Sequence, residues 1–155
     1  MVQRLNDRLL ALCLFFVCLC LLGAIALSGA LAEPERKTID LDHYIESQRP
    51  VSKGSRTIFV PKPVAFTARL KSHPETIEVA YLYEALSVSK VSPLPEVSHQ
   101  MFVQSDGGQV IAVYVEDRLV DGIVDGLALE ALAEFDAYHV YNYSRGPAMV
   151  VEAVR

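Results

Sequence analysis

The longest apolar stretch of the chain covers residues 9–32 and contains no charged residue. Arg4 and Arg8 precede it, with Asp7 between them, and two acids, Glu33 and Glu35, follow it. Because positive charge before an apolar segment favours a cytoplasmic N-terminus, this pattern predicts that everything after residue 32 crosses a membrane. We therefore expect an exported chain, periplasmic or extracellular.

Two interpretations of residues 1–32 remain open, a cleaved signal peptide and an uncleaved signal anchor. The segment ends in small residues with an A-x-A pattern at Ala30 and Ala32, which is typical of a signal-peptidase site. Its length favours an anchor, since a signal core has about 7 to 15 apolar residues and a spanning helix about 20. The small-residue tail makes cleavage after Ala32 the favoured interpretation. An uncleaved segment would make the membrane itself a partner through residues 9–32.

Residues 33–63 are polar and carry four prolines, so we expect an extended tether with at most a helical turn. Within it, residues 57–60 form a short strand candidate, which the neighbouring Pro61 and Pro63 would confine to the edge of a sheet. Residues 64–70 alternate apolar and polar positions, which predicts a half-buried strand.

Residues 74–91 give conflicting signals. Ile77, Val79, Tyr81 and Tyr83 suit a strand, whereas Ser72 with Glu75 resembles a helix capping box. We favour a long strand over residues 76–91, and a helix stays the alternative.

Two apolar runs, residues 101–104 and 110–115, flank a segment that contains Asp-Gly-Gly, which is a strong signal for a β-hairpin. The following apolar positions are spaced by three and four residues and predict an amphipathic helix within residues 120–135. An alternative starts this helix only near Leu127. The spaced apolar positions are Val120, Val124, Leu127, Ala131 and Phe135.

Residues 137–143 and 148–154 read as a terminal hairpin, with a turn at residues 144–147. Three strands, one helix and two strands is the order of an OB-fold. The expected fold is therefore β-rich, α+β by content: a small OB-like barrel or sheet of five to six strands, with one helix between the third and fourth core strands. Residues 64–155 would be this single domain, after the N-terminal signal or anchor helix.

Charge narrows the possible partners. The chain has a formal net charge of −5, and the segment after residue 32 keeps the excess of acids without a basic stripe. Nucleic-acid binding depends on neutralising phosphates with Lys and Arg, so nucleic acid is not an expected partner. All three cysteines lie within residues 9–32, so no disulfide is expected in the exported part.

Motifs for metal, cofactor or nucleophilic chemistry are not found in the sequence. The four histidines are scattered without ligand-pair spacing, and no nucleophile elbow or glycine-rich phosphate loop occurs. We therefore predict no metal, no cofactor and no catalytic residue, and an enzyme is the less favoured class. Asp121 and Asp125 read as solvent-facing acids of the amphipathic helix.

The best candidate for a ligand surface is the segment Tyr138-His139-Val140-Tyr141-Asn142-Tyr143. In a regular strand His139, Tyr141 and Tyr143 share one face, where the rings could stack on a flat ligand or a sugar. The expected function is an exported, non-catalytic module that binds a partner protein or a small ligand. The alternatives are a small exported enzyme or ligand carrier with its site at this face, and a bitopic membrane-anchored protein.

Overall fold

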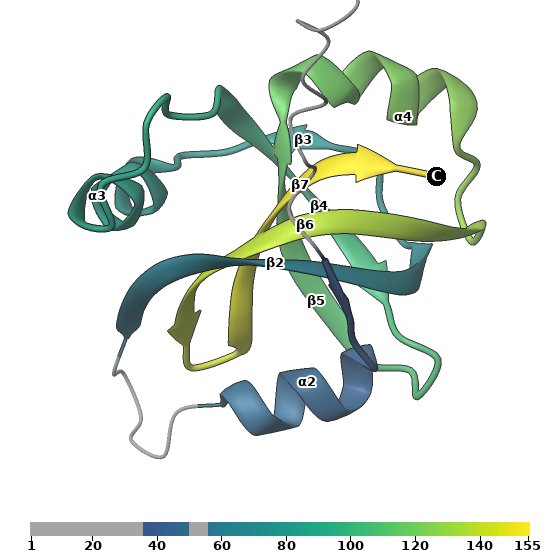
Figure 1. Cartoon of the computed structure of the whole chain (residues 1–155). Helices are drawn as coiled ribbons and strands as arrows, with labels where there is room; N and C mark the ends of the chain where they lie inside the picture. Colours follow the sequence, from purple (N-terminus) through teal and green to yellow (C-terminus); the bar gives the residue numbers. More distant parts are fainter. Residues whose placement is uncertain (1–35, 50–55) are drawn as a thin grey trace, which may run out of the picture. The chain divides into compact units, whose positions relative to one another are not determined.

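The structure, a computed structural model, describes residues 36–49 and 56–155, which form a β-rich domain with a seven-stranded mixed sheet and three α-helices (Figure 1). The signal or anchor segment and its cleavage residues Ala30 and Ala32 lie outside the described residues. The strands are β1 (Lys37–Thr38), β2 (Thr57–Leu70), β3 (Glu75–Thr76), β4 (Val97–Gln104), β5 (Val110–Glu116), β6 (Leu132–Tyr143) and β7 (Gly146–Val154), and the helices are α2 (Leu41–Gln48), α3 (Ala80–Val88) and α4 (Val120–Gly126), with a 3-10 turn at Asp117–Leu119 before α4.

The strands pair in the order β1-β2-β6-β7-β5-β4-β3, and a further pairing joins β2 to β4. This last pairing is short, with Arg69 opposite Gln104 and Leu70 opposite Val103. The five long strands β2, β6, β7, β5 and β4 thus form a closed circuit of hydrogen-bonded neighbours. All long pairs are antiparallel except β5 with β7.

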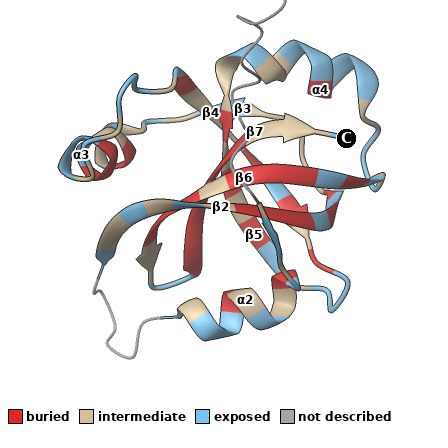
Figure 2. Cartoon of the chain, in the orientation of Figure 1, coloured by how far each residue is buried: buried red, intermediate tan, exposed pale blue. Residues whose placement is uncertain are grey.

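One face of each long strand contributes to a main core. Figure 2 shows the buried residues in red, and red segments occur on all five long strands. Phe66 of β2 stacks on Phe135 of β6 at 5.5 Å between ring centroids. Leu41 and Ile45 of α2 join this core, and Ile123 of α4 joins it as well. The two helices lie at opposite ends of the strand circuit in Figure 1.

A second apolar cluster lies between α3 and the opposite face of β4, β6 and β7. Leu82, Ala85 and Leu86 of α3 are all buried there, against Val140 and Val150. We call this contact the α3 cluster. It places α3 on a side of the strand circuit that the main core does not use.

Several sequence predictions are confirmed. The half-buried strand 64–70 is the second half of β2, and the hairpin 101–115 is β4 with β5, closed by a hydrogen bond from Ser105 N to Gln109 O of 2.9 Å. Gly108 has the positive φ, +87°, that such a turn requires. The terminal hairpin is β6 with β7.

The favoured strand over residues 76–91 is wrong. Only the two residues of β3 are extended, and α3 begins at Ala80 without a side-chain cap. The residues that become buried, Leu82, Ala85 and Leu86, are spaced by three and one, as one helix face requires. Burial of this stripe decides the conformation, although the β-branched and aromatic neighbours favour a strand.

The predicted helix within residues 120–135 is correct only for its first part. α4 ends at Gly126, and the strong helix formers after it are in a turn, with Glu130 at φ 66°. Glu130 N and Leu70 O form a hydrogen bond of 2.8 Å, which ties the turn to β2. Pairing of β6 with β2 from Leu132 onward outweighs local helix propensity. The alternative helix start near Leu127 is wrong too.

The expected extended tether is also wrong where the structure describes it. Within residues 33–63, α2 contributes two buried side chains to the main core, and the first half of β2 pairs with β6. Asp40 caps α2 by accepting a hydrogen bond from His43 N at 2.9 Å. These contacts fix the segment on the strands, and Ile45 is fully buried there.

Candidate functional site

His139, a predicted ligand residue, is fully buried and belongs to an internal polar network. Its Nε2 lies 2.7 Å from Asn142 Oδ1 and 3.2 Å from Tyr141 O, which are both acceptors, so Nε2 carries the proton. Nδ1 then accepts from the Tyr44 hydroxyl at 2.7 Å, and Asn142 Nδ2 donates to Gln48 Oε1 at 3.1 Å. Burial lowers the pKa of His139 to about 4. The network attaches α2 to β6, and His139 is a neutral structural residue.

A register shift between His139 and Tyr141 corrects the predicted shared face. His139 is opposite Met149, which lies in the main core, whereas Tyr141 is opposite Ala148, which lies in the α3 cluster. The extra residue, Val140, reverses the alternation, as a β-bulge does. Tyr141 and Tyr143 remain neighbours, with ring centroids 6.1 Å apart, but His139 points to the other side.

Tyr141 and Tyr143 line a small cavity of about 180 Å³, which we call the tyrosine pocket. Tyr141 is itself 5% exposed, and its hydroxyl lies 2.8 Å from the Tyr114 hydroxyl. Burial is the main reason that the pKa values of Tyr141 and Tyr143 are raised. The remaining lining residues are Arg56, Gln100, Ala112, Tyr114, Arg145 and Ala148.

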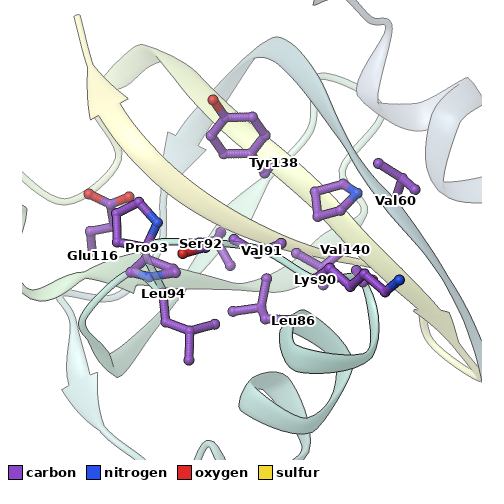
Figure 3. Close-up of a pocket in the computed structure, with 14 residues that line it drawn as sticks. Val60, Leu86, Lys90, Val91, Ser92, Pro93, Leu94, Glu116, Tyr138 and Val140 are labelled. Carbon is purple, nitrogen blue, oxygen red and sulfur yellow. The ribbon is translucent and has the colours of Figure 1, made fainter.

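A larger hollow of about 530 Å³ lies beside the C-terminal end of α3, and we call it the α3 groove (Figure 3). Its apolar surface comes from β6, β7, the end of β2, the end of α3 and the loop that follows α3. The volume is in the range of small-molecule sites. The lining residues are Val60, Pro61, Leu86, Ser89, Lys90, Val91, Ser92, Pro93, Leu94, Pro95, Glu116, Tyr138, Val140 and Val150.

Two charged side chains, Lys90 and Glu116, lie at opposite ends of the labelled groove residues in Figure 3. Glu116 is already paired, because its Oε2 lies 2.5 Å from Arg118 Nε. Lys90 has no carboxylate or hydrogen-bond partner for its amine among residues 36–49 and 56–155. Lys90 also has a positive φ of 58°, directly after the helix cap Ser89. The sequence alone did not single out Lys90, since its helix was not the favoured prediction.

One surface constellation looks superficially catalytic. His99 Nδ1 lies 2.9 Å from Asp117 Oδ1, and His99 Nε2 lies 3.4 Å from Thr76 Oγ1. Partial burial acts to raise the pKa of Asp117, but hydrogen bonds from His99 and Ser98 lower it overall. Thr76 is exposed, and none of the three residues lines either of the hollows described above. The arrangement joins β3, β4 and the turn after β5.

Three further acids lie outside both hollows. Asp121 and Asp125 are exposed on α4, as expected of solvent-facing acids. Asp42 of α2 accepts from Ser105 Oγ and from Gly107 N, the latter at 2.7 Å. The hydrogen bond from Ser105 is the main cause of the lowered pKa of Asp42. Within the described ranges no group of three His, Cys, Asp or Glu side chains could hold a metal ion.

Comparison with known proteins assigns this chain to no family. No model of a known protein family matches this sequence, and a search of curated proteins finds no match. Among the helices of the described part of the chain, none has the length and apolarity needed to span a bilayer.

Proposed function

We propose that this protein is an exported, non-catalytic binding module whose ligand occupies the α3 groove. The observation that carries the proposal is the groove itself, a mainly apolar hollow of about 530 Å³ with one unpaired amine, Lys90, at one end. An apolar cavity with few polar groups is the usual form of a small-molecule site. The ligand class that fits is a small amphiphile with an apolar body and an acidic head group.

The pairing order of the strands also supports the proposal of a binding module. We infer an OB-like barrel, because the five long strands pair in a closed circuit and α4 lies between β5 and β6, the third and fourth of them. The parallel pairing of β5 with β7 supports this inference. Barrels of this type commonly bind ligands on their outer strand faces and loops, and the α3 groove lies on such a face.

Export remains part of the proposal and rests on residues 1–32. The polarity of the flanking charges and the Ala30–Ala32 pattern support it. Mass spectrometry of the protein purified from its native compartment tests it, and an N-terminus at Glu33 is the expected result. An intact N-terminus in a membrane fraction would favour the bitopic alternative.

Binding is tested by calorimetric titration of the full-length chain with octanoate and, separately, with octylamine. We expect octanoate to bind more tightly, because its carboxylate can pair with Lys90. Leu94→Asp should abolish binding by placing a charge in the groove, where Leu94 is 44% exposed. Leu129→Asp is the matched control, since Leu129 is 51% exposed and lies outside the groove. The proposal would be contradicted if Leu94→Asp and Leu129→Asp bound octanoate with equal affinity, or if the native chain did not bind it.

A further inference from the structure

The tyrosine pocket has a chemistry that the α3 groove does not share. Its lining contains two guanidinium groups, Arg56 and Arg145, one amide, Gln100, and tyrosine hydroxyls. Among residues 36–49 and 56–155 no carboxylate lines it. The chain as a whole carries a net charge of −5, whereas both charged groups among these lining residues are cations. Hydrogen-bond donors and positive charge together favour a bound anion.

Both arginines are available to a ligand. In the described part of the chain neither has a carboxylate partner or a hydrogen-bonded acceptor. Arg56 stacks on the ring of Tyr81 of α3, with its guanidinium carbon 3.9 Å from the ring centroid. Stacking occupies the face of a guanidinium and leaves the N–H groups at its edge free, so the ring orients Arg56 without using its donors.

The tyrosines hold the wall of the pocket in place. Tyr81 packs edge-on against Tyr141 at 5.0 Å between centroids, so the ring that carries Arg56 also contacts the pocket wall. The hydroxyls of Tyr114 and Tyr141 share one hydrogen bond. One hydroxyl hydrogen of this pair therefore stays available to an acceptor in the pocket. Arg56 and the two hydroxyls are thus positioned before any ligand arrives, which limits the entropy lost on binding.

We propose that the tyrosine pocket binds an oxyanion, a phosphate or carboxylate group, with Arg56 and Arg145 as the charged donors. The cavity of about 180 Å³ is smaller than the sites that enclose drug-sized ligands, which favours a single anionic group over a whole sugar or a large ring system. Planar guanidinium groups match the geometry of carboxylate and phosphate oxygens. The site is separate from the α3 groove, and the proposal does not depend on the function assigned to that groove.

The test titrates the full-length chain with inorganic phosphate, phenyl phosphate and benzoate at constant ionic strength, with sodium chloride as the blank. Calorimetry gives the affinity. Three of the seven tyrosines line the pocket and the chain has no tryptophan, so tyrosine fluorescence serves as a second readout. We expect saturable binding of at least one probe. Arg56→Gln and Arg145→Gln should each weaken it by about 10- to 100-fold.

The matched control is Arg69→Gln, which removes an exposed arginine of β2 that donates to Glu130 O and does not line the pocket. It should leave the affinity unchanged, and Leu94→Asp should do the same. Tighter binding of phenyl phosphate would identify an esterified phosphate as the ligand, equal binding of inorganic phosphate would identify the free ion, and preference for benzoate would identify a carboxylate. The proposal is overturned if no probe binds up to roughly 10 mM, or if Arg56→Gln and Arg145→Gln bind like Arg69→Gln.

Discussion

The helices α2 and α3 attach to the strands in different ways. α2 inserts Leu41 and Ile45 into the main core and adds specific polar contacts, through Asp42 to the β4–β5 turn and through Tyr44 to His139. α3 packs on the outer strand face mainly through apolar side chains, and the α3 groove lies beside its C-terminal end. The two helices therefore have different roles in the fold. α2 completes the main core, whereas α3 leaves part of the outer strand face exposed as the α3 groove.

The largest expected effect tests whether both helices belong to one cooperative unit. Ile45→Ala and Leu82→Ala each remove a fully buried side chain, and each should lower the free energy of unfolding by about 2–5 kcal/mol. Urea denaturation followed by circular dichroism measures both. If Ile45→Ala cost less than about 1 kcal/mol, α2 would be a loosely attached segment, and the contrast with α3 would fail.

The polar attachment of α2 is tested at Gly107. A Cβ atom there would lie 2.7 Å from the Asp42 carboxyl group, so Gly107→Ala should displace Asp42 from its two donors and cost about 1–3 kcal/mol. Gly122→Ala in α4 is the control, because its Cβ would meet no atom within 4 Å. That change should stabilise the helix by up to about 1 kcal/mol. Equal melting temperatures for the two variants would argue against the Asp42 contact.

The buried histidine of the same attachment predicts a pH dependence. The pKa of His139 is lowered from 6.5 to about 4, so the unfolded chain takes up a proton before the folded one does. Stability is therefore complete above pH 6.5 and is lost as the pH falls toward 4, by roughly 1 kcal/mol per pH unit. His139→Gln should flatten this slope between about pH 6.5 and 5. An unchanged slope would assign the effect to other groups.

The smallest effect concerns the hydrogen bonds that the Tyr83 hydroxyl forms from the middle of α3. The hydroxyl of Tyr83 accepts from Val97 N at 3.0 Å and lies 3.2 Å from Pro95 O and from Val97 O. Tyr83→Phe removes these bonds and should cost about 0.5–1.5 kcal/mol, measured by thermal denaturation. If Tyr83→Phe lowered the free energy of unfolding as much as Leu82→Ala does, polar contacts would hold α3 as strongly as its apolar side chains do.

Local pattern predicted the elements whose alternation is regular. The second half of β2 (residues 64–70), the β4–β5 hairpin and the β6–β7 hairpin follow from period-two alternation and from turn residues such as Gly108. The errors fall where a long-range contact decides the conformation. α3 depends on burial of Leu82 against the outer strand face, and the end of α4 depends on the tie between Glu130 and Leu70.

The candidate site was predicted only in part. Tyr141 and Tyr143 do line a pocket, but a bulge at Val140 turns His139 toward the main core, and a single extra residue in a strand leaves no clear trace in the sequence. Arg56 and Lys90 lie far from the tyrosine segment along the chain, and only the fold brings them to the outer strand face. Spacing rules do not detect sites assembled in this way.

The first half of β2 has a consequence for self-association. Thr57, Ile58, Lys62 and Pro63 pair with β6 on one side of the strand. Within the described sheet no strand covers the other side of residues 57–63. Pro61 and Pro63 remove two backbone donors from this open edge, and the exposed Lys62 adds a charge between them. A strand of a second chain can therefore form few backbone hydrogen bonds with this edge, although Val60 is 74% exposed there. The protein can keep this edge open beside the α3 groove without inviting strand-to-strand aggregation.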